Sequence, residues 1–194
     1  MGTIEENREH ILNAGEVRFR QYGFNKTTMA EIAGDCQMST ANIYRFFENK
    51  DAIVAEMVKS CMLDAEATLR DILQRPGLTA AERLEALLIE KLRIAHYRTC
   101  EQPKMKEMVK YISCKRQDLM VRHVEVQQSL IAEILADGNR TGEFRVDDVV
   151  TTSDLILQAL AICKTPIISD VYDLEELEKS VRGIVRLIIQ GVGA

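Results

Sequence analysis

Two helix-start signals stand close together in the first quarter of the chain, and they constrain its fold more than any other feature. Glu31 follows Thr28 at the spacing of a capping box, in which each side chain accepts a hydrogen bond from the other residue's backbone N–H. Ser39 repeats the start signal a short way on. Only a few apolar positions at helical spacing follow each start. We therefore predict two short helices joined by a tight turn, which is a helix-turn-helix.

Apolar residues at helical spacing also fill most of the remaining chain, and no segment alternates as a β-strand does. The pattern and its start and stop signals predict helices over residues 4–22, from Asn49 to Pro76-Gly77, from Thr79 toward Pro103, just after Pro103, over 115–137 with a stop at Gly138, over about 147–164, and from Leu174 to Ile188. We predict an all-α fold. A three-helix helix-turn-helix module over residues 1–50 is joined by a long helix to a helical domain over residues 51–194.

Charge and cysteine content narrow the function classes. The net charge is −5, and residues 1–50 carry six basic and seven acidic residues, so charge alone neither supports nor excludes DNA as a partner. The five cysteines are scattered and form no CxxC pair, which argues against a disulfide framework and a zinc finger. No apolar run is long enough to cross a membrane, and the first residues are polar. We expect a cytoplasmic protein with no membrane partner.

Residues 27–53 resemble the DNA-binding signature of the tetracycline-repressor-like (TetR) family. The features that carry the resemblance are a double Thr after a Gly-aromatic turn, an Ile-Ala pair, a Ser cap, an Ile-Tyr pair followed by Phe-Phe, and a Lys before an apolar helix: Thr27-Thr28, Ile32-Ala33, Ser39, Ile43-Tyr44, Phe46-Phe47 and Lys50. The resemblance implies a homodimeric transcriptional regulator, most simply a repressor that binds a palindromic operator and leaves it when a small, largely apolar effector binds. It implies no enzyme activity, cofactor or resident metal. The family usually has Gly where this chain has Gln37, and a positive φ there would cost on the order of 1 kcal/mol.

The resemblance assigns DNA contacts to both short helices, and the recognition helix is expected over residues 39–45. A helix of this size fits the major groove, where Asn42 suits adenine and Arg45 suits guanine. Base contacts are expected from Thr40, Ala41, Asn42 and Arg45, and phosphate or cap contacts from Thr27, Thr28, Ser39, Tyr44 and Lys50. The alternative is that Thr28 and Ser39 only cap helices and Tyr44 is core. Core positions of the module are expected at Met29, Ile32, Ala33, Cys36, Met38, Ile43 and Phe47.

The larger domain is expected to hold an effector cavity, because the resemblance implies one. Soft or amphipathic side chains are the candidates for its lining: Cys61, Met62, His96, Tyr97, Cys100, Met105, Met108, Tyr111, Cys114, Met120 and Gln127. Ordinary core packing is the alternative for most of them. A basic run at Lys104, Lys106, Lys110, Lys115 and Arg116 is interpreted as a solvated face, with an anionic ligand or DNA as the alternative.

His96 and Cys100 share a helix face and suggest a metal or thiol-redox sensor as an alternative function. Two ligands are too few for a structural zinc site. No catalytic motif occurs.

The last two predicted helices are the candidate dimer interface. The helix over about 147–164 is apolar almost all round, and the last helix carries an apolar stripe. This is more apolar surface than one subunit is expected to cover, so we predict a four-helix interface between two copies. Its expected members are Leu157, Leu160, Leu177, Val181, Ile184 and Ile188.

Overall fold

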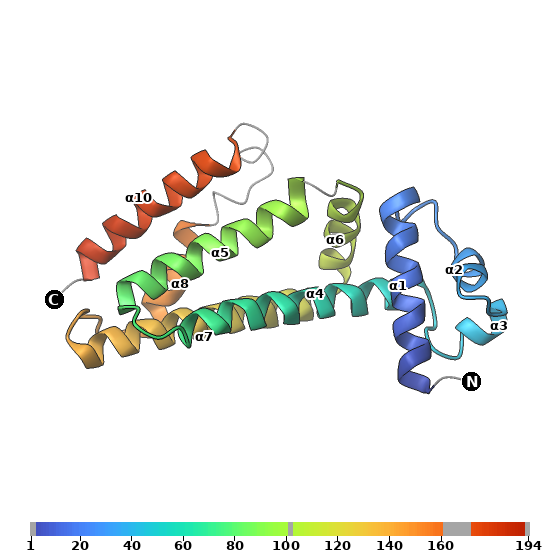
Figure 1. The fold of residues 1–194 in the computed structure, drawn as a ribbon, viewed down its shortest axis with the longest axis horizontal. Coiled ribbons are helices and arrows are strands. Elements are labelled where there is room, and N and C mark those ends of the chain that lie inside the picture. The colour runs from blue at the N-terminus through green and yellow to red at the C-terminus, as the bar shows by residue number, and fades with distance from the viewer. Residues whose placement is uncertain (1–2, 101–102, 161–171, 193–194) are drawn as a thin grey trace. The chain divides into compact units, whose positions relative to one another are not determined.

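Helices are the only regular elements in the parts of the chain that the computed structural model describes, residues 3–100, 103–160 and 172–192 (Figure 1). They are α1 (Ile4–Tyr22), α2 (Met29–Asp35), α3 (Thr40–Ile43), α4 (Lys50–Leu73), α5 (Ala80–Cys100), α6 (Pro103–Lys115), α7 (Gln117–Thr141), α8 (Val149–Ala159) and α10 (Leu174–Val192). The all-α prediction is confirmed, and the predicted bounds of the first helix agree with α1. None of these helices is long and apolar enough to span a membrane.

The chain packs as two compact units. The first unit comprises the described residues of Met1–Leu63 and Gln102–Met120, and the second those of Asp64–Glu101 and Val121–Ala194. Helix α4 therefore contributes its first part to one unit and its last turns to the other. This division differs from the sequence-based division at residue 50, because the start of α4 and all of α6 pack with the helix-turn-helix.

The first unit is built around side chains from α1, α2, α3, α4 and α6. Ile11 and Phe19 of α1 are fully buried, as is Ile32 of α2. Met108 and Ile112 of α6 lie in the same core. Met29, Ala33, Cys36, Ile43 and Phe47 are also buried, and Met38 is packed against the cluster, so the predicted core of the module is confirmed.

Basic residues of α6, and Arg116 directly after it, bond to groups of the first unit. The Lys104 ammonium donates a hydrogen bond to the carbonyl of Gln21. The Lys115 ammonium lies 2.6 Å from Asp51 Oδ2. Arg116 pairs with Asp118 at 2.8 Å. Lys110 is exposed, and the side chain of Lys106 lies outside the described residues. All members of the run with described side chains are exposed, as predicted for a solvated face, and three of them also have intramolecular partners.

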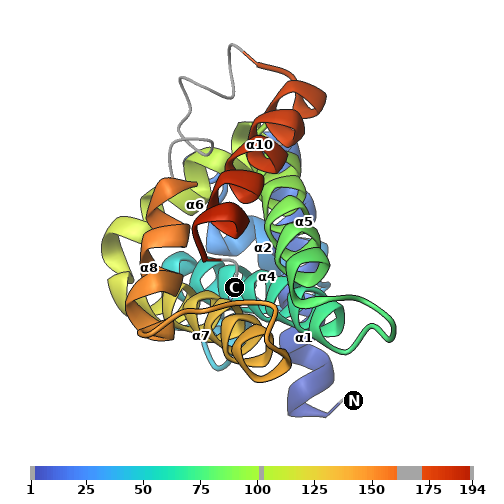
Figure 2. The ribbon, with the colours of Figure 1, turned by 90° about the vertical axis from the view of Figure 1, so that its left-hand side faces the viewer.

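The second unit is a helical layer around a leucine- and isoleucine-rich core. α10 lies along α5 (Figure 2). Arg93 of α5 donates to Glu178 of α10 at 2.6 Å, and Leu84, Leu87, Val181 and Val185 fill the interior. The apolar stripe of α10 is thus buried against α5 and the core of its own chain.

That packing corrects the basis of the predicted dimer interface. The core of a single chain buries four of the predicted residues, which are Leu157 and Leu160 at the C-terminal end of α8 and Leu177 and Val181 of α10. Ile184 and Ile188 are half-buried against the same core. One chain therefore covers most of the apolar surface that was expected to need a second copy. The part of the predicted helix beyond Leu160 lies outside the described residues.

Helix α7 runs past its predicted stop at Gly138 and ends at Thr141. The ring of Phe144 packs directly on Gly138, where an added Cβ would lie 2.1 Å from Phe144 Cδ2. Gly138 is thus a site of close approach and not a helix end. The chain turns instead at Gly142, whose φ of 77° favours glycine.

Candidate functional site

The start of α2 is fixed by the predicted capping box. Thr28 Oγ1 accepts from the backbone N–H of Glu31, and Glu31 Oε2 accepts from the backbone N–H of Thr28 at 2.8 Å. Hydrogen bonds from Thr28 hold the pKa of Glu31 below its usual value. Thr28 remains exposed, but Thr27 is buried and its hydroxyl donates to the carbonyl of Gly23 at 2.9 Å. The expected phosphate contact of the Thr27 side chain is therefore corrected to a bond within the preceding turn.

Helix α3 presents polar and small side chains above a buried anchor. Ser39 Oγ accepts from the backbone N–H of Asn42 at 3.2 Å, which confirms the predicted cap. Ile43 is fully buried and fixes which face of the helix is inward. Thr40, Ala41 and Arg45 are exposed, Asn42 is half-buried, and Tyr44 is 51% exposed, so the alternative that Tyr44 is a core residue is excluded.

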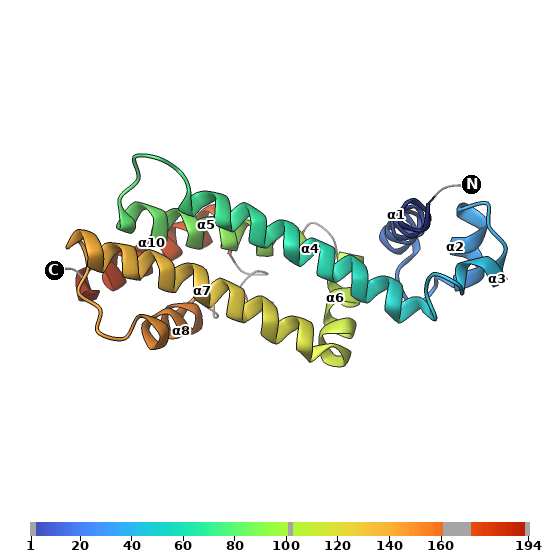
Figure 3. The ribbon, with the colours of Figure 1, turned by 90° about the horizontal axis from the view of Figure 1, so that it is seen from below.

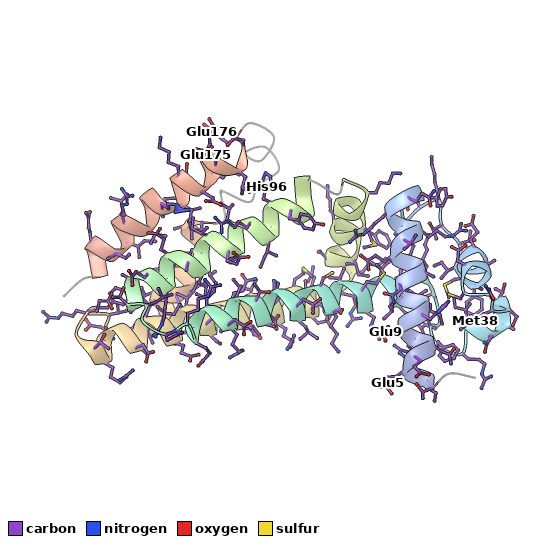
Figure 4. All side chains as sticks on the ribbon, viewed as in Figure 1. Glu5, Glu9, Met38, His96, Glu175 and Glu176 are labelled. Atoms are coloured by element: carbon purple, nitrogen blue, oxygen red, sulfur yellow. The ribbon has the colours of Figure 1, made fainter. Side chains whose placement is uncertain are left out.

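The turn between α2 and α3 contains the backbone strain that the sequence suggested. Gln37 has a φ of 55° and is the sole non-glycine residue with positive φ in the described part of the chain. Met38 follows it, lies between the two helices (Figure 4) and donates its backbone N–H to Ala33 at 2.8 Å. The turn therefore adopts the left-handed geometry for which the family usually uses Gly.

Lys50 has partners within the fold that the sequence did not predict. Its ammonium donates to the carbonyls of Phe24 and Thr27 at 2.5 and 2.7 Å and lies 4.1 Å from the centre of the Phe24 ring. Burial lowers the pKa of this amine. Lys50 is thus a half-buried clamp on the turn between α1 and α2. The expected phosphate contact of Lys50 stays a prediction, beside this role within the fold.

A second clamp was not found from the sequence. Arg18 of α1 donates to Asp35 of α2 at 2.6 and 2.9 Å and lies 3.2 Å from Glu31. The bonds from Arg18 hold the pKa of Asp35 below its usual range. Arg18 and Asp35 are 17 positions apart, and no local pattern in the sequence points to their pairing.

The predicted effector residues divide between the two units. Cys61, Met62, Met108, Tyr111 and Met120 belong to the first unit, and His96, Tyr97 and Gln127 to the second. Met62 and Met108 are core residues, whereas Cys61, Cys114 and Tyr97 are exposed. Tyr111 stacks on Phe24 with 4.7 Å between ring centres, and Met120 accepts a hydrogen bond from Ser113. The side chains of Cys100 and Met105 lie outside the described residues.

Gln127 is the predicted effector residue with the most distinctive surroundings. It is 7% exposed, and its Nε2 lies 2.7 Å from His123 Nε2. His123 Nδ1 in turn lies 2.8 Å from Oε1 of the buried Glu66. Glu66 and His123 were not predicted as site residues, although a charged residue inside an apolar helical stripe, Glu66, was a usable signal in the sequence.

Two hollows are described by their lining residues, and neither contains a predicted effector residue. One lies in the second unit between the turn after α4 and the end of α7, with Arg83, Glu133 and Asp137 in its wall. The other lies along α1 beside Arg18 and Tyr22.

No cluster of three or more His, Cys, Asp or Glu side chains within the described ranges could hold a metal ion. His96 lies near the C-terminal end of α5 and is half-buried (Figure 4). Its proposed partner Cys100 has no described side chain, so the sensor alternative stays a prediction.

Family models match both parts of this chain. Residues 11–57 match the model of bacterial regulatory proteins of the tetR family, and residues 80–185 match the tetracyclin repressor-like C-terminal domain. The HTH-type transcriptional regulator HbdR of Aromatoleum sp. (strain CIB) is 34% identical over 59 residues, which are 30% of this chain and 26% of that protein. The HTH-type transcriptional repressor KstR2 of Mycobacterium tuberculosis is 23% identical over 147 residues, covering 75% of this chain and 73% of that protein.

Solved structures share the fold. A regulator from Mesorhizobium loti, described as TetR-family, is 17% identical with a TM-score of 0.80, covering 100% of both chains. FadR of Thermus thermophilus, solved with lauroyl-CoA, is 21% identical with a TM-score of 0.64, covering 92% of both chains. RolR, solved with resorcinol, is 14% identical with a TM-score of 0.64, covering 98% of this chain and 89% of that one.

Proposed function

The chain belongs to the tetR family of bacterial regulatory proteins, and from that premise we propose that it is a cytoplasmic repressor that binds a palindromic operator as a dimer and is released by a small, largely apolar effector. The observation that carries the DNA part is helix α3, which is capped by Ser39 and anchored by the fully buried Ile43. A short helix held in this way can enter the major groove with its polar face outward.

Within that proposal, some residues of α3 and its surroundings reach base edges and others reach phosphates. Arg45 is exposed and long enough to reach a guanine edge in a bidentate manner, and Asn42 suits adenine. Thr28 at the start of α2 and Tyr44 directly after α3 are exposed and are proposed to contact phosphates, which position the module without reading sequence. Buried Thr27 and clamped Lys50 support this interface by holding the turn before α2.

The proposed dimer face is revised toward the side chains that one chain leaves exposed. Leu155 of α8 is 57% exposed and Leu187 of α10 is 70% exposed. Half-buried Ile184 and Ile188 lie on the same helix as Leu187. Burial of such side chains against a second copy would stabilise a symmetric interface. Leu187→Glu is expected to lower the mass measured by light scattering to that of a monomer, and Gln190→Glu on the same helix is the matched control.

The effector part of the proposal is supported by relatives of the same fold. Two such proteins were solved with small molecules, FadR with lauroyl-CoA and RolR with resorcinol. We propose that this chain also takes a small molecule in its helical domain. Binding would lower operator affinity only by the difference between the effector's affinities for the DNA-free and DNA-bound forms, and a tenfold loss needs about 1.4 kcal/mol.

Ala41→Glu tests the DNA interface with little disturbance of the fold. Ala41 is exposed in the first turn of α3, where a carboxylate suits the helix N-terminus but opposes phosphates. The variant is expected to lose binding to a duplex selected by the wild-type protein, measured by fluorescence anisotropy. Ala67→Glu, an exposed alanine on α4 in the second unit, supplies the control. Equal operator affinity of Ala41→Glu and wild type would contradict the interface.

A further inference from the structure

A chain of buried polar groups crosses from α4 to α7 inside the second unit. Glu66 of α4 is 6% exposed and Gln127 of α7 is 7% exposed, and His123 lies between them. The two contacts, Glu66 Oε1 to His123 Nδ1 at 2.8 Å and His123 Nε2 to Gln127 Nε2 at 2.7 Å, make one continuous relay. α4 and α7 run side by side at this level (Figure 3). We name these three residues the polar relay.

The polar relay interrupts two apolar stripes. On α4, Ala65 and Leu69 are buried on either side of Glu66. On α7, the buried stripe that starts at Gln127 continues with Leu130, Ile131, Ile134 and Leu135. Polar groups at core positions lower stability unless each finds a partner, and apolar residues there would pack without that demand. The relay thus places specific hydrogen-bonding chemistry next to an apolar wall, which is how small-molecule sites are composed.

The donor and the acceptor of each hydrogen bond in the polar relay follow from the atoms that it joins. An amide nitrogen can only donate, so Gln127 Nε2 donates to His123 Nε2, which is therefore the unprotonated nitrogen. His123 Nδ1 then carries the proton and donates to the Glu66 carboxylate. A carboxylate behind an imidazole fixes its tautomer and makes the far nitrogen a stronger acceptor. The Arg122 guanidinium lies 3.7 Å from the other Glu66 oxygen and partly balances its charge.

The hydrogen-bonding role of His123 Nε2 determines which ligand group can bind to the polar relay. His123 Nε2 accepts a hydrogen bond, so it suits a hydroxyl that donates one. A ligand carboxylate has no proton to donate and would meet the negative charge of Glu66 nearby. Gln127 ends in an amide on a flexible side chain, which can swing aside when a ligand hydroxyl takes its bond to His123. The adjacent leucine and isoleucine side chains are buried in the core of the same chain, so an apolar ligand body would have to take the place of part of that packing.

We propose that the polar relay is the anchor of the effector, with His123 Nε2 accepting a hydrogen bond from a neutral, weakly acidic hydroxyl, as in a phenol, on an otherwise apolar molecule. This inference rests on the proposed function, because it supplies the ligand class for the same effector-binding domain. It assigns Glu66 as the positioning residue for His123 and Gln127 as the group that the ligand replaces.

Matched probes test the anchor on the full-length protein. Para-propylphenol, its methyl ether para-propylanisole and para-propylbenzoate share an apolar body and differ in the polar group. Calorimetry is expected to give the phenol an affinity about tenfold or more above the other two, the size of one well-made buried hydrogen bond. His123→Phe is expected to remove that preference. Gln128→Leu, the neighbouring glutamine whose Nε2 donates to Val150 at 3.2 Å, is expected to retain it.

A second readout covers the case in which His123→Phe fails to fold. Nitrogen NMR of isotope-labelled histidine in the wild-type protein reports the Nε2 of His123 directly, and the phenol is expected to shift it while the ether does not. Equal affinities for phenol and ether, no binding by any of the three, or an unshifted His123 would each overturn the anchor. A phenol that binds at the polar relay without weakening operator binding would refute the effector part of the proposed function while leaving the anchor in place.

Discussion

Replacement of Lys50 by Met tests whether this lysine stabilises the fold or instead contacts DNA. The side chain is half-buried, and its ammonium donates to the carbonyls of Phe24 and Thr27 at 2.5 and 2.7 Å. Both acceptor residues are buried, so water cannot fully replace the lost bonds. Methionine keeps most of the length and apolar volume of the stem while removing the charge and all three donors.

The expected loss follows from those contacts. A hydrogen bond that involves a charged group contributes about 1.5 to 3 kcal/mol, so two sum to about 3 to 6 kcal/mol, and the partial exposure of the amine reduces that sum by roughly a third. Lys50→Met is therefore expected to lower the free energy of unfolding by about 2 to 4 kcal/mol. For a chain of this length that corresponds to a fall in melting temperature of roughly 4 to 16 °C.

Calorimetric melting of the DNA-free protein measures the effect. Lys26→Met is the matched control, because Lys26 is an exposed lysine of the same turn. The control is expected to melt with the wild type. If Lys50→Met also melted with the wild type, while the salt slope of its DNA binding fell by about one unit as for a lost phosphate contact, the clamp would be refuted.

Three further predictions concern single side chains. Arg45→Ala is expected to weaken operator binding by about 1 to 3 kcal/mol and to relax the preference at one base pair per half-site. Competition with substituted duplexes measures both effects. Equal losses of affinity for operator and random DNA would contradict base reading by Arg45. Gln37→Gly is expected to raise the free energy of unfolding by up to about 1 kcal/mol in denaturant titration, because relief of the φ of 55° outweighs the added freedom of the unfolded chain; a destabilised variant would contradict it. The pKa of Glu178 is lowered below the ordinary 4.5, chiefly by Arg93, so the stabilisation that Glu178 provides is present above that value and is lost as the pH falls through the lowered pKa. Glu178→Gln should therefore melt below the wild type at neutral pH and at the same temperature as the wild type in acid. A difference in melting temperature that stays constant with pH would exclude this titration.

Local signals in the sequence predicted the elements of the DNA-binding module well. A helix start depends on a few consecutive residues, and the caps at Thr28 and Ser39 lie where the capping box and the serine indicated. The strained turn at Gln37 was also predictable, because the turn geometry is local and its usual glycine is absent.

Contacts between distant residues were not predictable in the same way. Lys50 bonds to carbonyls that are 23 and 26 positions away, and no local pattern distinguishes such a lysine from a solvent-exposed one. Gly138 has the composition of a helix stop, yet it accommodates the ring of Phe144 and α7 continues beyond it. Four of the six predicted dimer residues are buried within the chain itself for a related reason. An apolar stripe predicts burial, but it does not say whether the chain itself or a second copy covers Leu177 and Val181.

The proposed effector site lies between these cases. Amphipathic composition pointed to Gln127 and a charge inside an apolar stripe marked Glu66, while the pairing of Glu66 with His123 becomes evident only when two helices are placed side by side. Selection by soft side chains also gathered core residues such as Met62 and Met108, because methionine fills both pockets and ordinary cores.

Selection of bound sequences from a random duplex library is the most direct measurement of the central claim, that α3 reads operator DNA. The wild-type protein is expected to enrich an inverted repeat of two half-sites, and Ala41→Glu, which retains the fold but carries a charge opposed to phosphate, is expected to enrich none. Failure of the wild-type protein to enrich any motif, or recovery of the same motif by Ala41→Glu, would contradict the account.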